Sequence, residues 1–393
     1  MLFEDIHSYI KSKQLIFVVD EIQWIAKNKA GFIGAIKNKW IDFEKSGNMR
    51  LVICGSSNKF FHNYTGGEEQ ILRGLKTRSD IWVKPVDLKI LKNSYFRKWK
   101  LEEILLIYMF VGGVPYYLNQ IDRDKNFYTS INEILFEPQS LFIEEVDEVL
   151  KLEFNKAGII TIKKILNSLG MRGRCFSDIQ KRTKISNSTL SEAIEKLIEY
   201  NIIEEVKPAF ANSKENSSGT KYLMRDFYLN TYFNLIKPNL AKINRNSDKN
   251  LIINSIFHWP RAFYYIENFT GEAFENFIIF LLRESVERKE PLFQKLGLRN
   301  INFDVGTHWD KERQLDIVIY NCQDMQNRIL ECKWTSSIQI ITDAILQLRK
   351  KASDMKDLEN SLLGVVIPIM PSKALERIAN ENHVVLISQS DFL

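Results

Sequence analysis

An uninterrupted apolar run near the amino terminus most constrains the fold of this chain. Residues 15–19 (LIFVV) contain no polar side chain and are followed directly by Asp20 and Glu21. A run that does not alternate is typical of a strand buried on both faces of a parallel sheet. Acidic residues directly after such a strand face the crevice in which open α/β sheets bind their ligands. We therefore expect an α/β fold with a first candidate site at residues 20 and 21.

The residues that follow complete one strand–helix–strand unit. Large apolar side chains recur at helical spacing between residues 32 and 43, and a second apolar run, LVIC at 51–54, ends in Gly55 and Ser56. These patterns predict a helix followed by a second short strand. The connection between the two strands is expected to be right-handed.

Three segments in this order carry a family resemblance: FVVDEIQWI, LVICGSSNKFF and VGGVPYYL. With them the chain resembles the archaeal-type ATPase family, a branch of the P-loop NTPases related to AAA+ and STAND proteins. The resemblance implies ATP and Mg²⁺ as cofactors. Asp20 would then hold the water shell of the magnesium ion, Glu21 would polarise the attacking water, and Ser56 or Asn58 would sense the terminal phosphate.

The chain departs from this family in its phosphate-binding loop. The pattern G-x-x-x-x-G-K-[ST], which should precede the Asp20–Glu21 pair, occurs nowhere in the chain. Backbone amides and the lysine of that loop supply most nucleotide affinity in this fold. We therefore interpret residues 1–90 as a partial, N-terminally truncated P-loop ATPase core that does not hydrolyse ATP by itself. The pattern also leaves open whether Arg73 or Arg78 is the charge-stabilising arginine. The alternative interpretation of Asp20 and Glu21 is a solvated strand end, against which the two further motifs argue.

The middle of the chain predicts two helical segments. A helix between residues 101 and 120 is interrupted at Gly112–Pro115, where only a turn or a bent helix fits. Residues 91–150 resemble the helical lid of the ATPase family, although the interruption can equally be a packing turn.

Residues 151–235 have the outline of a winged helix: three helices followed by two short strands around a polar loop. In DNA-binding members the first turn of the third helix enters the major groove and the loop, here 212–221, is the wing. The predicted contacts are Asn187, Ser188, Thr189, Lys214 and Lys221. The same third helix carries Glu192, Glu195 and Glu199, which would repel phosphates. DNA binding and a role as a scaffold between domains therefore both stay open.

Residues 236–393 predict a carboxyl-terminal domain of order α-β-β-β-α-β. A helix with apolar residues at helical spacing around 274–281 precedes three strands, of which LDIVIY and RILECKW form an antiparallel hairpin. Alternation along this hairpin turns Asp316 away from its apolar neighbours and places Glu331 and Lys333 on one face. Two carboxylates suit a hard cation such as Mg²⁺, and the lysine ammonium can orient a nucleophile.

This segment resembles the PD-(D/E)XK, restriction-endonuclease-like superfamily, and within it the uncharacterised domain that commonly follows archaeal-type ATPase modules. The resemblance implies catalytic roles for Asp316, Glu331, Lys333, Glu275 and Gln347, and metal binding by Asp316, Glu331 and Glu275. Glu275 would be the glutamate of the first helix and Gln347 a helical glutamine that some members carry. The expected fold is thus an α/β multidomain chain with an incomplete P-loop NTPase sheet, a helical lid, a winged helix-turn-helix and a restriction-endonuclease-like domain.

Composition narrows the class of protein further. The chain has 393 residues with 54 basic and 49 acidic side chains, so its net charge of +5 permits nucleic-acid contact without demanding it. Four scattered cysteines match neither a zinc site nor a disulfide framework, and no apolar run reaches the ~20 residues of a membrane span. We expect a cytoplasmic protein that does not bind membranes and that self-associates or joins a missing ATPase segment. We expect it to be a metal-dependent nuclease that acts on nucleic acid, and the alternatives are a non-catalytic DNA-binding or regulatory protein that uses the winged helix and an inactive gene fragment.

Overall fold

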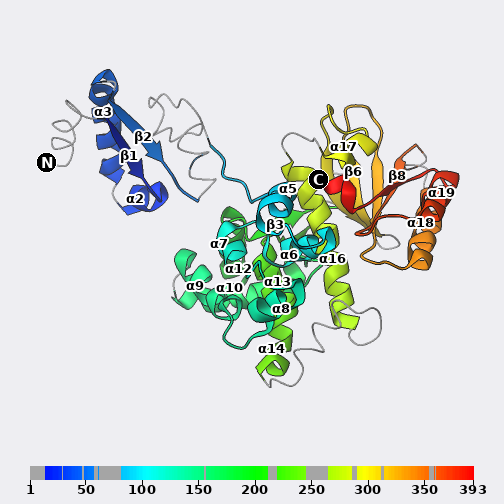
Figure 1. Cartoon of the computed structure of the whole chain (residues 1–393). Helices are drawn as coiled ribbons and strands as arrows, with labels where there is room; N and C mark the ends of the chain where they lie inside the picture. The colour runs from blue at the N-terminus through cyan, green and yellow to red at the C-terminus, as the bar shows by residue number, and fades with distance from the viewer. Residues whose placement is uncertain are drawn as a thin grey trace. The chain divides into compact units, whose positions relative to one another are not determined.

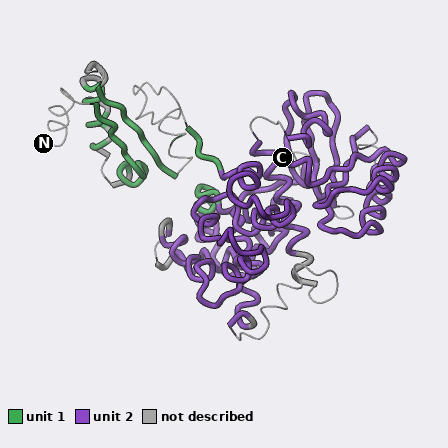
Figure 2. Tube along the Cα trace, in the orientation of Figure 1, with its two compact units in different colours: residues 1–84, 195–201 green, residues 85–194, 202–393 purple. Residues whose placement is uncertain are grey.

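The computed structural model describes residues 14–28, 30–46, 48–56, 61, 81–154, 156–210, 219–244, 264–285, 290–310, 314–353, 358 and 360–393. The chain divides into two compact units, drawn in different colours in Figure 2. Unit 1 comprises residues 1–84 and 195–201, and unit 2 comprises residues 85–194 and 202–393. The boundaries expected at residues 90, 150 and 235 stay a prediction. Among the described helices, none combines the length and the apolar character that a membrane span requires.

Unit 1 contains the predicted strand–helix–strand unit. Strand β1 (Leu15–Val19) is followed by α2 (Ile22–Asn28), α3 (Ala30–Ser46) and β2 (Met49–Ile53). The two strands are parallel, with Leu15 opposite Met49 and Val19 opposite Ile53. Helices α2 and α3 pack on the sheet through a small apolar core that includes Val19, Ile22 and Ile36.

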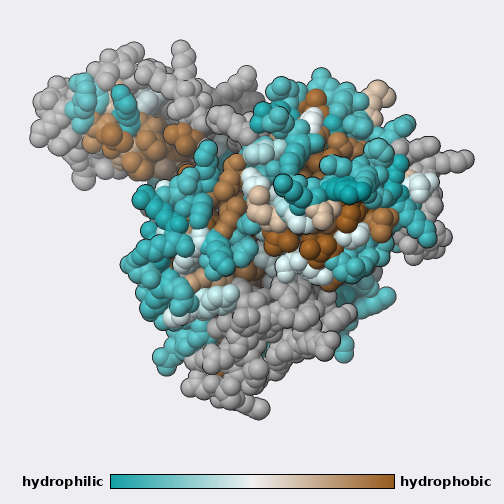
Figure 3. Space-filling view, turned by 45° about the vertical axis from the view of Figure 1, so that its right-hand side comes forward, coloured by the Kyte–Doolittle hydropathy of each residue, from teal (hydrophilic) through white to brown (hydrophobic). Residues whose placement is uncertain are grey.

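Burial of this sheet differs from the sequence prediction. The other face of the two strands exposes Ile16, Val18 and Val52 by 66%, 55% and 42%. Figure 3 shows brown, hydrophobic residues on the surface of unit 1. The expectation of a strand buried on both faces was therefore wrong for the described residues, because a continuous apolar run shows only that each face is apolar and not that each face is covered.

The first part of unit 2 is helical and contains the predicted break. Its elements are α5 (Leu88–Ile90), η1 (Leu91–Tyr95), α6 (Leu101–Val111), α7 (Pro115–Asn119), α8 (Phe127–Ile131), η2 (Asn132–Phe136) and α9 (Leu141–Glu153). Helix α6 ends where Gly112 adopts a φ of +70°, and Pro115 begins α7. A Cβ on Gly113 would lie 2.5 Å from the carbonyl oxygen of Val86, so a glycine is needed here for close packing.

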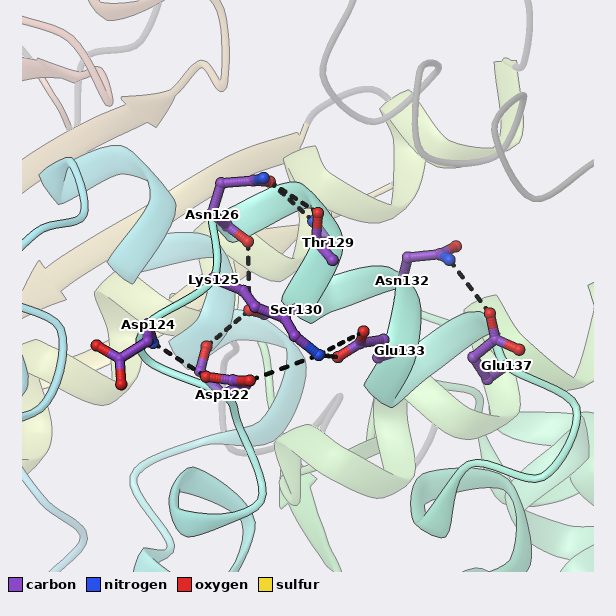
Figure 4. A network of polar contacts seen from close by, with 9 residues as sticks. All are labelled: Asp122, Asp124, Lys125, Asn126, Thr129, Ser130, Asn132, Glu133 and Glu137. Carbon is purple, nitrogen blue, oxygen red and sulfur yellow. Dashed lines mark hydrogen bonds and ion pairs between the residues drawn. The ribbon is translucent and has the colours of Figure 1, made fainter.

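A polar network fixes the turn that leads into α8 (Figure 4). Asn126 caps the helix by accepting a hydrogen bond of 3.0 Å from the Thr129 N–H. Lys125 bridges the Glu133 and Asp122 carboxylates at 2.7 and 3.5 Å. Because the side chains of Lys125, Asp122 and Glu133 are 43%, 44% and 42% exposed, this network orders the loop and forms no enclosed site.

The predicted order of three helices and a hairpin is also present. Helices α10 (Lys156–Leu169), α11 (Phe176–Thr183) and α12 (Asn187–Glu199) precede the antiparallel strands β3 (Ile203–Val206) and β4 (Lys221–Met224). Ile203 pairs with Met224 and Val206 with Lys221. Lys221 is therefore the first residue of a strand, whereas the sequence analysis placed it at the end of the wing loop.

The carboxyl-terminal part of unit 2 is built on a five-stranded sheet of order β5-β6-β7-β8-β9 (Figure 1). Strand β6 pairs antiparallel with both β5 and β7, and β8 pairs parallel with both β7 and β9. The strands are β5 (Asp304–Trp309), β6 (Gln314–Tyr320), β7 (Arg328–Cys332), β8 (Leu362–Val366) and β9 (Val384–Ile387). The helices that follow β4 in the chain are α13 (Phe227–Thr231), η3 (Tyr232–Ile236), α14 (Lys237–Asn244), α16 (Tyr264–Glu284), α17 (Pro291–Lys295), α18 (Ile338–Ser353), α19 (Lys373–Glu381) and η5 (Gln389–Phe392).

The predicted α-β-β-β-α-β order corresponds to α16, β5, β6, β7, α18 and β8. Helix α18 packs on the sheet face formed by Val318, Ile329 and Val365 through Ile341 and Ile345. The additional elements α17, α19 and β9 were not predicted. The chain is thus a mixed α/β protein with three small sheets among its described residues.

Candidate active site

The hairpin of β6 and β7 brings Asp316 and Glu331 together. Ile317 pairs with Leu330, so the next residues outward, Asp316 and Glu331, face each other across the two strands and share a sheet face. Both side chains are buried, with exposures of 8% and 9%. One oxygen of Asp316 accepts a hydrogen bond of 3.0 Å from the backbone N–H of Cys332. The predicted convergence of these two acids is therefore present.

Burial sets the electrostatics of this pair. Two effects raise the pKa of Asp316 to about 6: burial is the larger, and the negative charge of Glu331 is the second. The positive charge of Lys333 and the hydrogen bond from Cys332 act in the opposite direction. Burial and repulsion between the two neighbouring carboxylates therefore favour the protonated form of Asp316.

Two lysines contact Glu331. The Lys333 ammonium lies 2.7 Å from one carboxylate oxygen, and the Lys351 ammonium lies 3.3 Å from the other. Burial lowers the pKa of Lys333, but Glu331 and Asp316 outweigh it and the net pKa is raised. Lys351 lies on α18, one turn after Gln347, which is exposed. Lys351, which was not predicted, is the α18 residue that pairs with Glu331.

Glu275 lies on α16 and is half-buried. Burial and the charge of Asp316 raise its pKa well above the ordinary value, so Glu275 belongs electrostatically to the same acidic cluster. However, the described residues contain no group of three or more His, Cys, Asp or Glu side chains placed to hold one metal ion. The predicted three-ligand set of Glu275, Asp316 and Glu331 is therefore not assembled, and both oxygens of Glu331 face lysines instead.

A second polar cluster lies at the carboxyl ends of β1 and β2 in unit 1. The amide nitrogen of Gln23 donates to the Glu21 carboxylate and, at 3.0 Å, to the Ser56 hydroxyl. The Ser56 hydroxyl lies 3.4 Å from the same carboxylate. An oxygen of Asp20 accepts from the N–H of Glu21 at 3.0 Å. Glu21 and Ser56 are thus brought together by Gln23, which the sequence analysis missed, while Asn58, Arg73 and Arg78 lie outside the described residues.

The predicted nucleic-acid contacts are dispersed. Asn187, Ser188 and Thr189 are exposed in the first turn of α12, but Glu192 and Glu195 are also exposed on this helix. Lys214 lies outside the described residues. The ammonium of Lys221 lies 4.1 Å from the ring centroid of Trp309 on β5, against the sheet that carries the acids.

Comparison with known proteins gives no assigned function. Residues 232–347 match a family described as archaea bacterial proteins of unknown function (DUF234), and this stretch contains all five predicted catalytic residues. An uncharacterized protein of Methanocaldococcus jannaschii, MJECL04, is 25% identical over 333 residues, which cover 84% of this chain and 70% of that protein.

Two solved structures show a weak similarity. Can2 from Sulfobacillus thermosulfidooxidans, determined in complex with cyclic tetra-adenylate, has a TM-score of 0.23 and 13% identity, and the match covers 63% of this chain and 53% of Can2. Protein VC1899 from Vibrio cholerae has a TM-score of 0.21 and 12% identity, with 96% and 88% covered. At these scores neither structure carries an argument about fold or function. The sequence comparisons alone thus relate this chain to proteins of unknown function.

Proposed function

We propose that this chain is a metal-dependent nuclease whose active site contains Asp316, Glu331 and Lys333. The observation that carries the proposal is the buried pair of carboxylates on one hairpin, with a lysine two residues after the second acid. The resemblance to PD-(D/E)XK enzymes implies the same arrangement, in which carboxylates on successive strands are followed by a lysine.

A magnesium ion at this site would have two protein ligands, of which Glu331 pairs with Lys333 and Lys351 in the structure. Mg²⁺ is usually held by one or two carboxylates together with waters and substrate phosphates, so the lack of a third acid in the group is compatible with it. Asp316 and Glu331 would hold the ion, whose charge would counteract the burial and the repulsion from Glu331 that raise the pKa of Asp316. A cation there supplies an activated water and neutralises charge on the phosphoryl oxygens.

Lys333 would act as a hydrogen-bond donor. Its pKa is raised, so its ammonium is protonated at neutral pH and does not accept a proton from water. It would orient the attacking water or a non-bridging phosphate oxygen. Burial and the charge of Asp316 raise the pKa of Glu275 well above the ordinary value and so favour its protonated form, and Glu275 would lie behind the site without acting as a ligand.

The test is cleavage of plasmid and single-stranded DNA with Mg²⁺ or Mn²⁺ by the full chain. Lys333→Met should lower the rate by about 100-fold or more, as loss of an oriented charged donor does in other active sites. Lys350→Met, which removes an exposed lysine of α18, is the matched control and should retain activity. Equal cutting by all three proteins would point to a contaminant. No cutting by the wild type with either metal would favour a non-catalytic regulator or an inactive fragment.

A second proposal concerns unit 1. We propose that it descends from a P-loop NTPase core, because Glu21 and Ser56 meet at the carboxyl ends of two parallel strands. Since the glycine-rich loop is absent from the sequence, we expect Glu21→Gln to leave any ATP turnover unchanged. A loss of Mg²⁺-dependent ATP hydrolysis in this variant would contradict the expectation.

A further inference from the structure

A tight loop between α10 and α11 presents Arg172 to the carboxyl-terminal sheet. Gly173 adopts a φ of +65°, and a Cβ on it would lie 2.5 Å from the carbonyl oxygen of Tyr222 on β4. Arg174 and Tyr222 exchange backbone hydrogen bonds of 3.2 and 2.8 Å. The loop is therefore fastened to the β3–β4 hairpin on the carboxyl side of Arg172.

The Arg172 side chain reaches the neighbourhood of the acidic site. Its Nε lies 2.7 Å from a carboxylate oxygen of Glu272, one turn before Glu275 on α16. Its Nη1 lies 3.3 Å from the side-chain oxygen of Gln314, which precedes Asp316 by two residues on β6. The Arg172 side chain is nevertheless 61% exposed. These two hydrogen bonds leave most of the five guanidinium N–H donors available to a ligand.

Lys221 is a second cation beside Arg172. It lies over the ring of Trp309, and Trp309 pairs with Gln314 in the sheet. Burial lowers the pKa of Lys221, and the positive charge of Arg172 lowers it further. Two cations are thus held close enough to repel each other at the edge of an acidic site. An anion between them would relieve this repulsion.

We propose that Arg172 and Lys221 bind backbone phosphates of the nucleic-acid strand that the acidic site receives. The proposal rests on the proposed nuclease function. Carboxylates alone repel a polyanion, so a strand that approaches Asp316 and Glu331 needs cations beside it. Gln314 and Asp316 are separated by about 7 Å along β6, so Arg172 lies beside the site rather than within it. Arg172 and Lys221 are positioning residues in this scheme.

The test measures binding of the full chain to labelled single-stranded DNA, its duplex and RNA of the same sequence, in EDTA, by fluorescence anisotropy over a salt series. The double variant Arg172→Gln/Lys221→Met should bind the preferred substrate at least about tenfold more weakly. The negative slope of its log association constant against log salt concentration should become shallower by about two. Lys207→Met is the matched control, because Lys207 is an exposed lysine of the same hairpin that pairs with Glu205. The loss of binding affinity in Lys207→Met should be much smaller than in the double variant.

Glu272→Gln separates phosphate binding from a structural role of the ion pair. If Arg172 only holds α16, Arg172→Gln and Glu272→Gln should weaken binding alike. If Arg172 binds phosphate, Glu272→Gln should tighten binding several-fold, because it removes the competing carboxylate. An unchanged salt slope in the double variant, or an equal loss in Lys207→Met, would overturn the proposal. Competition by millimolar inorganic phosphate as effective as that by oligonucleotide would indicate a site for free phosphate and would overturn the strand assignment.

Binding in EDTA also separates this inference from the nuclease proposal. Specific loss of binding in the double variant, together with a wild type that never cleaves, would support the phosphate site and reject the nuclease. Cleavage that depends on Lys333, together with normal binding by the double variant, would support the nuclease and reject the phosphate site.

Discussion

At the scale of single residues, Asp316 should lower the stability of the folded chain at neutral pH. Its pKa rises from the ordinary 3.8 to about 6 on folding, so between these values the folded state holds a proton that the unfolded state has lost. The contribution of this carboxyl to stability therefore falls as pH rises from about 4 to 6 and stays low above pH 6. The difference corresponds to roughly 2 to 3 kcal/mol.

Asp316→Asn should remove this penalty, because the amide oxygen can still accept from the Cys332 N–H. The variant should melt about 5 °C higher than the wild type at pH 8 and should show no such gain at pH 4. Asp343→Asn, an exposed acid of α18, serves as the control and should shift the melting temperature little at either pH. An equal gain at both pH values would mean that ionisation of Asp316 is not the cause.

The site was predictable from the sequence only where its residues share one hairpin. Asp316 and Glu331 follow from strand alternation and from the polar connection between two apolar runs. Lys351 was missed because the rotation of α18 about its axis depends on tertiary packing. Arg172 was missed because it is 100 residues from Glu272, and no local pattern reports a contact at that separation.

At the scale of elements, replacing two glycines by alanine should change the stability of the chain in opposite directions. Gly271 lies inside α16, and a Cβ there would meet nothing within 4 Å. Gly271→Ala should therefore stabilise the chain by about 0.5–1 kcal/mol, since alanine restricts the unfolded chain and favours the helix. Gly173→Ala should destabilise it by about 1–3 kcal/mol, because its φ is positive and the methyl group would overlap Tyr222. Urea unfolding of both variants gives the comparison, and changes of equal sign would contradict it.

Most elements of the fold were predictable because their patterns are local. The helix break at Gly112–Pro115, the β3–β4 hairpin and the β6–β7 hairpin each combine an apolar period with turn residues. Burial of β1 was not predictable, because the exposure of Ile16 and Val18 depends on which elements cover the sheet. The short strand β9 (Val384–Ile387) was not predicted, although its four residues are apolar, because the predicted order ended with the preceding strand β8.

At the scale of the whole molecule, the segments of unit 2 are tied together by polar contacts across long sequence separations. Arg225 pairs with Glu284 at 2.8 Å, Arg283 pairs with Glu204 at 2.8 Å, and the N–H of Ala209 donates to the carbonyl of Thr307 at 2.9 Å. The hairpin segment and the carboxyl-terminal sheet therefore belong to the same compact unit.

The connection into unit 2 should be the first site of cleavage by chymotrypsin among the described residues. Residues 81–87 form neither helix nor strand, and Trp82 and Val83 are 65% and 92% exposed. Proteases cut exposed, extended segments far faster than packed elements. Brief digestion should therefore yield a resistant fragment that begins at Val83, identified by mass spectrometry. Trp82→Ser should slow the appearance of this fragment. An early cut within α6 or the five-stranded sheet would contradict the division into two units, because residues of those elements such as Ile104, Leu105 and Ile317 are fully buried.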